Sequence, residues 1–135
     1  MNTNVKGTLT EIKFLNKITE LGYCVSIPFD NKSKYDQIWD INGKLLKIQI
    51  KSCRWKDKRQ SGITFNCYSV CNGKKIFYTK DQVDYFATIW EDKYYLIPVD
   101  ECYSEKTLWF TLSSRANGNY SMASDYELEK VLDIK

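Results

Sequence analysis

Residues 35–52 read YDQIWDINGKLLKIQIKS and carry the strongest structural signal in the chain. Within them, Asn42-Gly43 lies between two runs that are rich in β-branched and aromatic residues. This dipeptide is typical of a type I′ turn, because both central positions of that turn need a positive φ. The stretch therefore predicts a β-hairpin with strands over residues 35–41 and 44–52.

The turn also sets the register of the predicted hairpin. In a two-residue turn Ile41 lies opposite Lys44, and the same register places Asp36 opposite Gln49. Lys51 follows two residues after Gln49 and shares its face of the strand. Opposed Cβ atoms lie about 5 Å apart and diagonal ones about 7–8 Å. We therefore expect a polar cluster that could share a metal ion or a phosphate across the two strands.

Alternation along the two strands assigns the second face of the hairpin to the core. The residues on this face are mostly large and apolar, as a buried sheet surface requires. They are Gln37, Trp39, Ile41, Leu46, Ile48 and Ile50.

The segment before the hairpin predicts an amphipathic helix over residues 5–21. Apolar residues recur every three or four positions, and Gly22 is a typical helix stop. At 100° per residue, Glu11 falls between Leu15 and Ile18, on or beside the buried face. A carboxylate in that position is costly unless a partner, a metal ion or water compensates it. The apolar stripe consists of Val5, Leu9, Ile12, Leu15 and Ile18.

The rest of the chain predicts further strands and one more helix. Ser124-Asp-Tyr-Glu127 has the pattern of a capping box, with Leu128, Val131 and Leu132 facing inward. The residues after Ser52 and before Gly62 read as a loop. Strands are expected at 23–27, 63–70, 75–79, 85–90, 94–99 and 108–112. Together these elements predict one α+β domain over residues 1–135, with a mixed central β-sheet flanked by helices.

The 135-residue chain contains no histidine, which excludes several chemistries. Ser-His and Cys-His nucleophile pairs and His-ligated zinc are ruled out, so hydrolysis would depend on carboxylates, lysines, amides and a metal with oxygen ligands. The five cysteines include no Cys-x-x-Cys pair, which favours free thiols in a reducing compartment. The N-terminus has no apolar core of a signal peptide, and no run approaches the 18 apolar residues of a membrane span. A cytoplasmic location is expected.

The charge distribution is uneven and indicates a polyanionic partner. Residues 1–99 carry a net charge of +6 and residues 100–135 one of −3, while residues 44–59 alone reach +6. Lysines beside the Asn72-Gly73 turn could form a β-ribbon that approaches the major groove of DNA. The candidate DNA-binding residues are Lys34, Lys47, Ser52, Arg54, Lys56, Lys58, Arg59, Lys74 and Lys75.

Glu11 on the helix, Tyr35-Asp36 at the start of the hairpin and Gln49-Ile50-Lys51 on its second strand form a recognisable pattern. The pattern resembles the PD-(D/E)XK phosphodiesterase superfamily, in which an acidic residue on a helix precedes a hairpin bearing an Asp and an acid-x-Lys triplet. It is most similar to the small homing endonucleases encoded in group I introns, which also carry Gln in this triplet. The resemblance covers residues 5–52 well and extends more loosely to Pro98.

The resemblance implies a restriction-endonuclease-like core and a role for each matched residue. Asp36, Gln49, the Ile50 carbonyl and Glu11 would bind Mg²⁺ or Mn²⁺, and Lys51 would orient or help deprotonate the attacking water. Glu11, Asp36, Gln49 and Lys51 are thus the candidate catalytic residues. The implied substrate is double-stranded DNA cut at a specific site, by a homo-oligomer that is a dimer or a tetramer.

The sequence departs from the family pattern at two positions. Tyr35 replaces the Pro of the family at a position that does no chemistry. Gln49 replaces an acid, so the site loses one negative charge and would neutralise a metal less. Two alternatives therefore stay open beside the site-specific endonuclease. They are a structure-selective nuclease of the Holliday-junction resolvase kind and a catalytically inactive DNA- or protein-binding module of the same fold.

Overall fold

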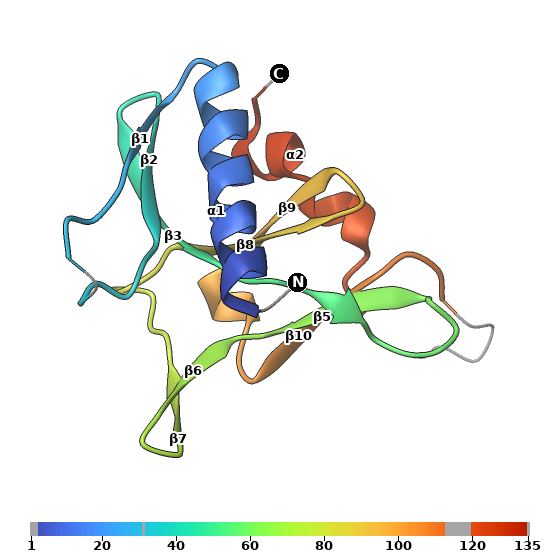
Figure 1. Cartoon of the computed structure of the whole chain (residues 1–135). Coiled ribbons are helices and arrows are strands. Elements are labelled where there is room, and N and C mark those ends of the chain that lie inside the picture. Colours follow the sequence, from blue (N-terminus) through green and yellow to red (C-terminus); the bar gives the residue numbers. More distant parts are fainter. Residues whose placement is uncertain (1–2, 31, 113–119, 135) are drawn as a thin grey trace.

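The computed structural model describes residues 3–30, 32–112 and 120–134, and Figure 1 shows the chain. Two helices, ten strands and two short 3₁₀ turns (Val99–Glu101 and Ala123–Tyr126) are found in these residues. The helices are α1 (Thr3–Glu20) and α2 (Leu128–Leu132). The strands are β1 (Cys24–Ser26), β2 (Gln37–Ile41), β3 (Lys44–Ile50), β4 (Arg54–Trp55), β5 (Gly62–Asn66), β6 (Tyr68–Cys71), β7 (Lys74–Phe77), β8 (Tyr85–Trp90), β9 (Lys93–Pro98) and β10 (Glu105–Trp109).

A five-stranded mixed sheet in the order β1-β2-β3-β8-β9 forms the centre of the structure. The β3–β8 pair is parallel and the other three pairs are antiparallel. The predicted hairpin register is confirmed, since Ile41 pairs with Lys44 and Trp39 with Leu46. Asn42 and Gly43 have φ values of 56° and 90°, as a type I′ turn requires.

The two faces of the central sheet are covered by different elements. Alternate residues of β8 and β9 point to opposite faces, so Ala87 and Leu96 join one apolar cluster and Phe86 and Ile97 the other. Helices α1 and α2 cover the first cluster, together with the inward face of the hairpin. The second cluster is covered by a three-stranded sheet in the order β10-β5-β4. The expected α+β fold with a mixed central sheet is therefore confirmed.

The buried face of α1 differs from the predicted stripe. Phe14 and Ile18 are fully buried, whereas Val5, Leu9 and Ile12 are 44%, 40% and 52% exposed. The prediction was wrong for these three residues because the helix packs on the central sheet through its second half. The apolar period predicts that a helix forms, but it does not predict which part of the helix is buried by the sheet.

Tertiary pairing also changed the predicted elements between residues 53 and 71. Arg54 and Trp55 form β4 by pairing with β5, so the expected loop contains a strand. The single strand expected over residues 63–70 is divided between β5 and β6. Cys67, at the break, is buried, and its N–H donates to the Ser104 carbonyl. The Asn72-Gly73 turn does join β6 to β7, and this two-stranded ribbon projects from the rest of the chain (Figure 1).

The capping box predicted at residues 124–127 does not open the last helix. Residues 123–126 form a 3₁₀ turn, and α2 begins only at Leu128. Glu127 is extended and forms a bridge with Tyr95 of β9, so pairing with the sheet overrides the local capping preference. Leu128 is buried and Val131 and Leu132 pack against the same cluster, as expected.

All five cysteines have free thiols. No helix within the described residues is long and apolar enough to cross a membrane.

Candidate active site

Asp36 lies directly before β2 and is fixed to the end of β3. Its N–H donates to the Ile48 carbonyl, and its Oδ2 accepts a 2.8 Å hydrogen bond from the Ile50 N–H. Burial raises the pKa of the Asp36 carboxyl, and this effect outweighs the Ile50 hydrogen bond and the positive charge of Lys51, which lower it. A cation bound beside the buried Asp36 carboxyl would therefore stabilise its ionised form.

Lys51 directly follows β3, and its side chain contacts the β6–β7 ribbon and the segment after it. Its Nζ donates a 3.1 Å hydrogen bond to the Tyr68 carbonyl and lies 5.4 Å from the centre of the Tyr78 ring. Burial lowers the pKa of Lys51, and the nearby Asp36 counteracts this only in part. The ammonium group is therefore easier to deprotonate than that of an exposed lysine, which suits a residue that handles protons.

Glu11 brings a second carboxylate to the same place from α1. Glu11 and Asp36 line one groove of about 310 Å³, and the Glu11 side chain is only partly exposed. Burial raises the pKa of the Glu11 carboxyl, and the negative charge of Asp36 raises it further. The other residues along the groove are Thr8, Ile12, Leu15, Ile27 and Gln37.

Gln49 lies near the end of β3, two residues before Lys51. Strand β3 pairs with β8 so that Gln49 is opposite Phe86, and alternation puts its side chain on the same strand face as Lys51. The amide is half-buried. Hairpin register and helix placement thus bring Glu11, Asp36, Gln49 and Lys51 to one end of β3.

The donors at this site suit a hard divalent cation. Two carboxylates with raised pKa values, one amide oxygen and the Ile50 main-chain carbonyl are all oxygen ligands, which Mg²⁺ and Mn²⁺ prefer. Among the described residues, no group of three or more His, Cys, Asp and Glu side chains is clustered closely enough to hold a metal. A metal here would therefore depend on the Gln49 and Ile50 oxygens in addition to the two carboxylates.

Two side chains that the sequence did not single out support the site. The pKa of Tyr78 is raised mainly by burial and also by the charge of Asp36, and its ring faces Lys51. No sequence pattern identifies Tyr78, because it contacts Lys51 only where the chain leaves the β6–β7 ribbon directly after β7. Gln37 is buried and donates a hydrogen bond to the Glu11 carbonyl on α1. Its position as a polar residue on the otherwise apolar inward face of the hairpin is the sequence feature that could have identified it.

The candidate DNA-binding residues are dispersed over several elements. Lys34 and Ser52 are exposed next to the hairpin, while Lys58 and Arg59 are exposed in the turn between β4 and β5. On the ribbon, Lys74 and Lys75 are exposed, and Lys75 lies over the Tyr68 ring.

Three of these cations have hydrogen-bond or ion-pair partners among the described residues. The Lys47 ammonium donates to the Asp81 carbonyl. Arg54 and Lys56 both form ion pairs with Glu105, a residue that sequence reasoning did not select. The charges of Arg54 and Lys56 are therefore partly neutralised in the protein alone.

The chain matches the PD-(D/E)XK endonuclease family over residues 1–129 and belongs to this family. The chain is also similar to a solved structure described as a bacterial homing endonuclease, I-Ssp6803I. The two chains share a TM-score of 0.78 and 20% identity, over 99% of this chain and 94% of the other. No curated protein matches the chain. The predicted superfamily is thus confirmed, and the structural likeness confirms the restriction-endonuclease-like fold.

Proposed function

We propose that this chain is a metal-dependent endonuclease that cuts double-stranded DNA at a specific site, as a single nuclease domain. One observation carries the proposal. The Asp36 carboxylate is bonded to the main chain between Gln49 and Lys51, and it shares a groove with Glu11. These residue types, in this arrangement, are those that metal-assisted phosphodiester hydrolysis needs.

Each side chain has a role that its surroundings support. Asp36, Glu11, Gln49 and the Ile50 carbonyl would hold Mg²⁺ or Mn²⁺. The bound metal would supply Lewis acidity at the phosphoryl oxygen and lower the pKa of a water. Lys51 would orient that water or accept its proton, since burial lowers its pKa and makes the ammonium proton easier to release. Its charged form would stabilise the negative charge that develops on the phosphorane.

The experiment that tests this function is a cleavage assay on duplex DNA. We expect cutting or nicking with Mg²⁺ or Mn²⁺ and none in EDTA. Asp36→Asn and Lys51→Ala should each abolish cleavage and leave DNA binding largely intact. Asp40→Asn and Lys44→Ala, on the same hairpin but at its turn, are the matched controls and should cleave normally. Retained cleavage in both site variants would contradict the assignment.

Gln49 favours a second candidate function, a DNA-binding module without activity. The site has one negative charge fewer than an acid-x-Lys triplet would give. A wild-type chain that binds duplex DNA but never cleaves it with either metal would favour this candidate. Tight binding to four-way junctions of any sequence, with no enriched duplex site, would instead favour a junction-resolving nuclease.

We also propose that the active form is a homo-oligomer, a dimer or a tetramer. Cutting two DNA strands needs two active sites, and a symmetric assembly supplies them with a palindrome-like target. Ile12 and Ile27 are large apolar side chains exposed beside Glu11 and Asp36, and Leu9 is exposed on α1; contact with a second copy would cover them. Light scattering should show the oligomer; a strict monomer with and without DNA would contradict it.

A further inference from the structure

The β10-β5-β4 sheet has two faces of opposite character. Ile63, Phe65 and Leu108 point inward and are fully buried in the second apolar cluster. Register pairs Arg54 with Thr64 and Thr64 with Thr107, so these three side chains share the other face. We call this the outer face; its residues are Arg54, Lys56, Thr64, Asn66, Glu105 and Thr107.

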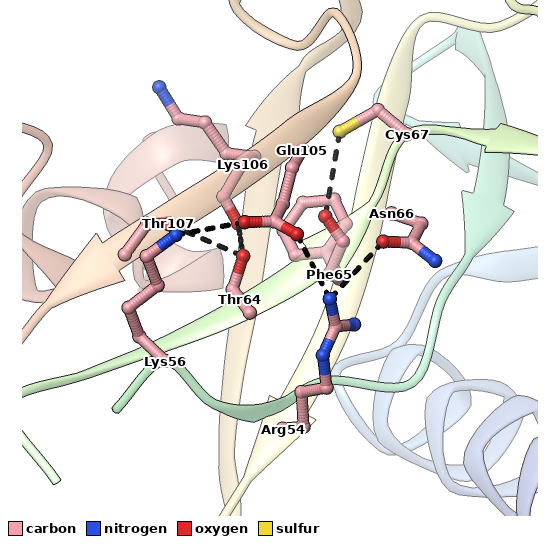
Figure 2. A network of polar contacts seen from close by, with 9 residues as sticks. All are labelled: Arg54, Lys56, Thr64, Phe65, Asn66, Cys67, Glu105, Lys106 and Thr107. Atoms are coloured by element: carbon pink, nitrogen blue, oxygen red, sulfur yellow. Dashed lines mark hydrogen bonds and ion pairs between the residues drawn. The ribbon is translucent and has the colours of Figure 1, made fainter. Parts of the chain in front are cut away.

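A single carboxylate on the outer face holds two cations at once (Figure 2). Arg54 Nη2 lies 3.0 Å from Glu105 Oε2, and Lys56 Nζ lies 2.9 Å from Glu105 Oε1. Arg54 Nη2 also donates to Asn66 Oδ1 at 3.3 Å. Each oxygen of Glu105 therefore has its own cationic donor, and the carboxylate fixes the positions of both.

The outer-face ion pairs remain accessible to a ligand. The side chains of Arg54, Lys56 and Glu105 are 53%, 37% and 37% exposed. The hydrogen bond from Lys56, and the charges of Lys56 and Arg54, hold the pKa of Glu105 below its usual range, so the carboxylate is ionised at neutral pH. Exposed pairs of this kind are weak and exchange readily with another anion.

We propose that Glu105 is a specificity-determining residue that competes with DNA phosphates for Arg54 and Lys56. The proposal rests on the proposed DNA-cleaving function. On a random duplex the two cations stay largely paired with Glu105 and add little to binding. On the correct site, close docking of the outer face lets phosphate oxygens displace the carboxylate, and both cations then contribute.

The physical basis is that phosphate contacts supply most non-specific affinity. An internal carboxylate lowers the number of counterions that the protein releases from any duplex. Two cations with one carboxylate present a net charge of +1 to DNA, compared with +2 if the carboxylate is neutral. Glu105 would thus weaken binding to wrong sites more than binding to the right one, which is how a repulsive element gives specificity.

The test measures binding of the full chain, without metal, to a pool of random-sequence duplexes across a salt series. Glu105→Gln should bind about 3- to 10-fold more tightly than wild type, and its salt slope should be steeper by about 0.9 for each cation released. Glu105→Asp keeps the charge and should remain near wild type. Glu129→Gln is the matched control, because it removes an equally short ion pair, with Lys17 on α1, and changes the net charge equally.

A second background shows whether the effect passes through the two cations. In a chain that carries Arg54→Ala and Lys56→Ala, the further change Glu105→Gln should leave affinity and salt slope unchanged. Sequence selection from the random pool should also return a less enriched site with Glu105→Gln than with wild type.

Three outcomes would overturn the inference. They are a Glu105→Gln variant that matches Glu129→Gln, one that binds random duplexes more weakly than wild type, or an unchanged effect in the Arg54→Ala, Lys56→Ala background. Failure of the proposed function is a separate result, since it appears as wild-type protein that does not cleave DNA with Mg²⁺ or Mn²⁺.

Discussion

Gln37 Nε2 donates a 2.8 Å hydrogen bond to the main-chain carbonyl of Glu11, and this bond joins β2 to α1 across 26 residues of sequence. The other end of the same amide is also used, because Gln37 Oε1 accepts a 2.9 Å hydrogen bond from Trp39 Nε1. Gln37 is buried, so neither bond can be replaced by bulk water. Gln37 thus links β2 to the turn of α1 that carries Glu11.

Replacing Gln37 by Leu should lower both stability and cleavage. The change leaves the buried Trp39 N–H without an acceptor and removes the link to the Glu11 carbonyl, which should cost about 1–3 kcal/mol in the free energy of unfolding. Urea unfolding at a constant m value measures this loss. Asn16→Leu, which removes an exposed hydrogen bond to Glu20 on the same helix, is the control and should change stability by less than about 0.5 kcal/mol. Equal losses of stability in the two variants would contradict this contribution of Gln37, and normal cleavage by the folded Gln37→Leu variant would show that it does not affect the candidate site.

The hairpin and its polar cluster could be predicted because their geometry is local. Asn42-Gly43 determines the turn, the turn determines the register, and the register brings Asp36 to the strand that carries Gln49 and Lys51. The pairing of Tyr78 with Lys51 and of Glu105 with Arg54 and Lys56 could not be predicted in this way. These contacts join residues far apart in sequence, since Tyr78 follows the β6–β7 ribbon and Glu105 meets the two cations only through pairing of β10 and β4 with β5.

Burial of the Asp36 carboxylate should make the metal-free protein sensitive to pH. A carboxyl with a raised folded-state pKa contributes its full stability below its ordinary pKa of 3.8 and loses it as pH rises through the raised value. Asp36→Asn removes this loss and keeps an acceptor for the Ile50 N–H. In EDTA at neutral pH, the variant should therefore melt above wild type, and the difference should shrink as pH falls towards 3.8.

The control for this pH series is Asp40→Asn on the same strand. The Asp40 carboxylate accepts a 2.9 Å hydrogen bond from the Gly43 N–H, so Asp40→Asn removes one carboxylate from the turn of the hairpin and leaves the candidate metal site intact. Added Mg²⁺ or Mn²⁺ should reverse the order of wild type and Asp36→Asn, because the cation stabilises the ionised site. A metal that leaves both melting temperatures unchanged would exclude Asp36 as a ligand.

Replacing Gln49 by Glu should strengthen metal binding. The change adds a third carboxylate beside Asp36 and Glu11, and a divalent cation is held more tightly by charged than by neutral oxygens. Without metal the added charge should lower the melting temperature, since like charges then repel one another in a half-buried place. Titration with Mn²⁺, followed by calorimetry, should give a lower Kd for the variant. An unchanged Kd would remove Gln49 from the ligand set.

Gly62 should tolerate no side chain, because the paired strand β10 crowds it at Leu108 and Trp109. A Cβ at this position would lie 2.8 Å from the main-chain carbonyl oxygen of Leu108 and 3.0 Å from the Trp109 ring. Gly62→Ala should therefore destabilise the β10-β5-β4 sheet by about 1–3 kcal/mol. Gly7→Ala, in α1, has open space around the new methyl group and should instead stabilise the chain slightly. Unfolding of the two variants in urea separates these outcomes, and similar stabilities would contradict the close approach.

Two exposed basic segments should affect DNA binding in different ways. Lys58 and Arg59 lie in the turn between β4 and β5, and Lys74 and Lys75 lie on the projecting β6–β7 ribbon. Phosphate contacts from the turn should act on all duplexes alike, so Lys58→Ala with Arg59→Ala should lower the salt slope by about 0.9 for each phosphate that no longer has a cation.

A ribbon that enters the major groove also reads base edges. Lys74→Ala with Lys75→Ala should therefore reduce discrimination between a selected site and random duplexes, as well as affinity. Titrations of the selected site and of the random pool at several salt concentrations provide both quantities. Lys93→Ala, at the β8–β9 turn, is the control for removal of one exposed positive charge. If the ribbon variant weakens both kinds of duplex by the same factor, the ribbon binds the backbone only, and base recognition must come from another surface of the chain.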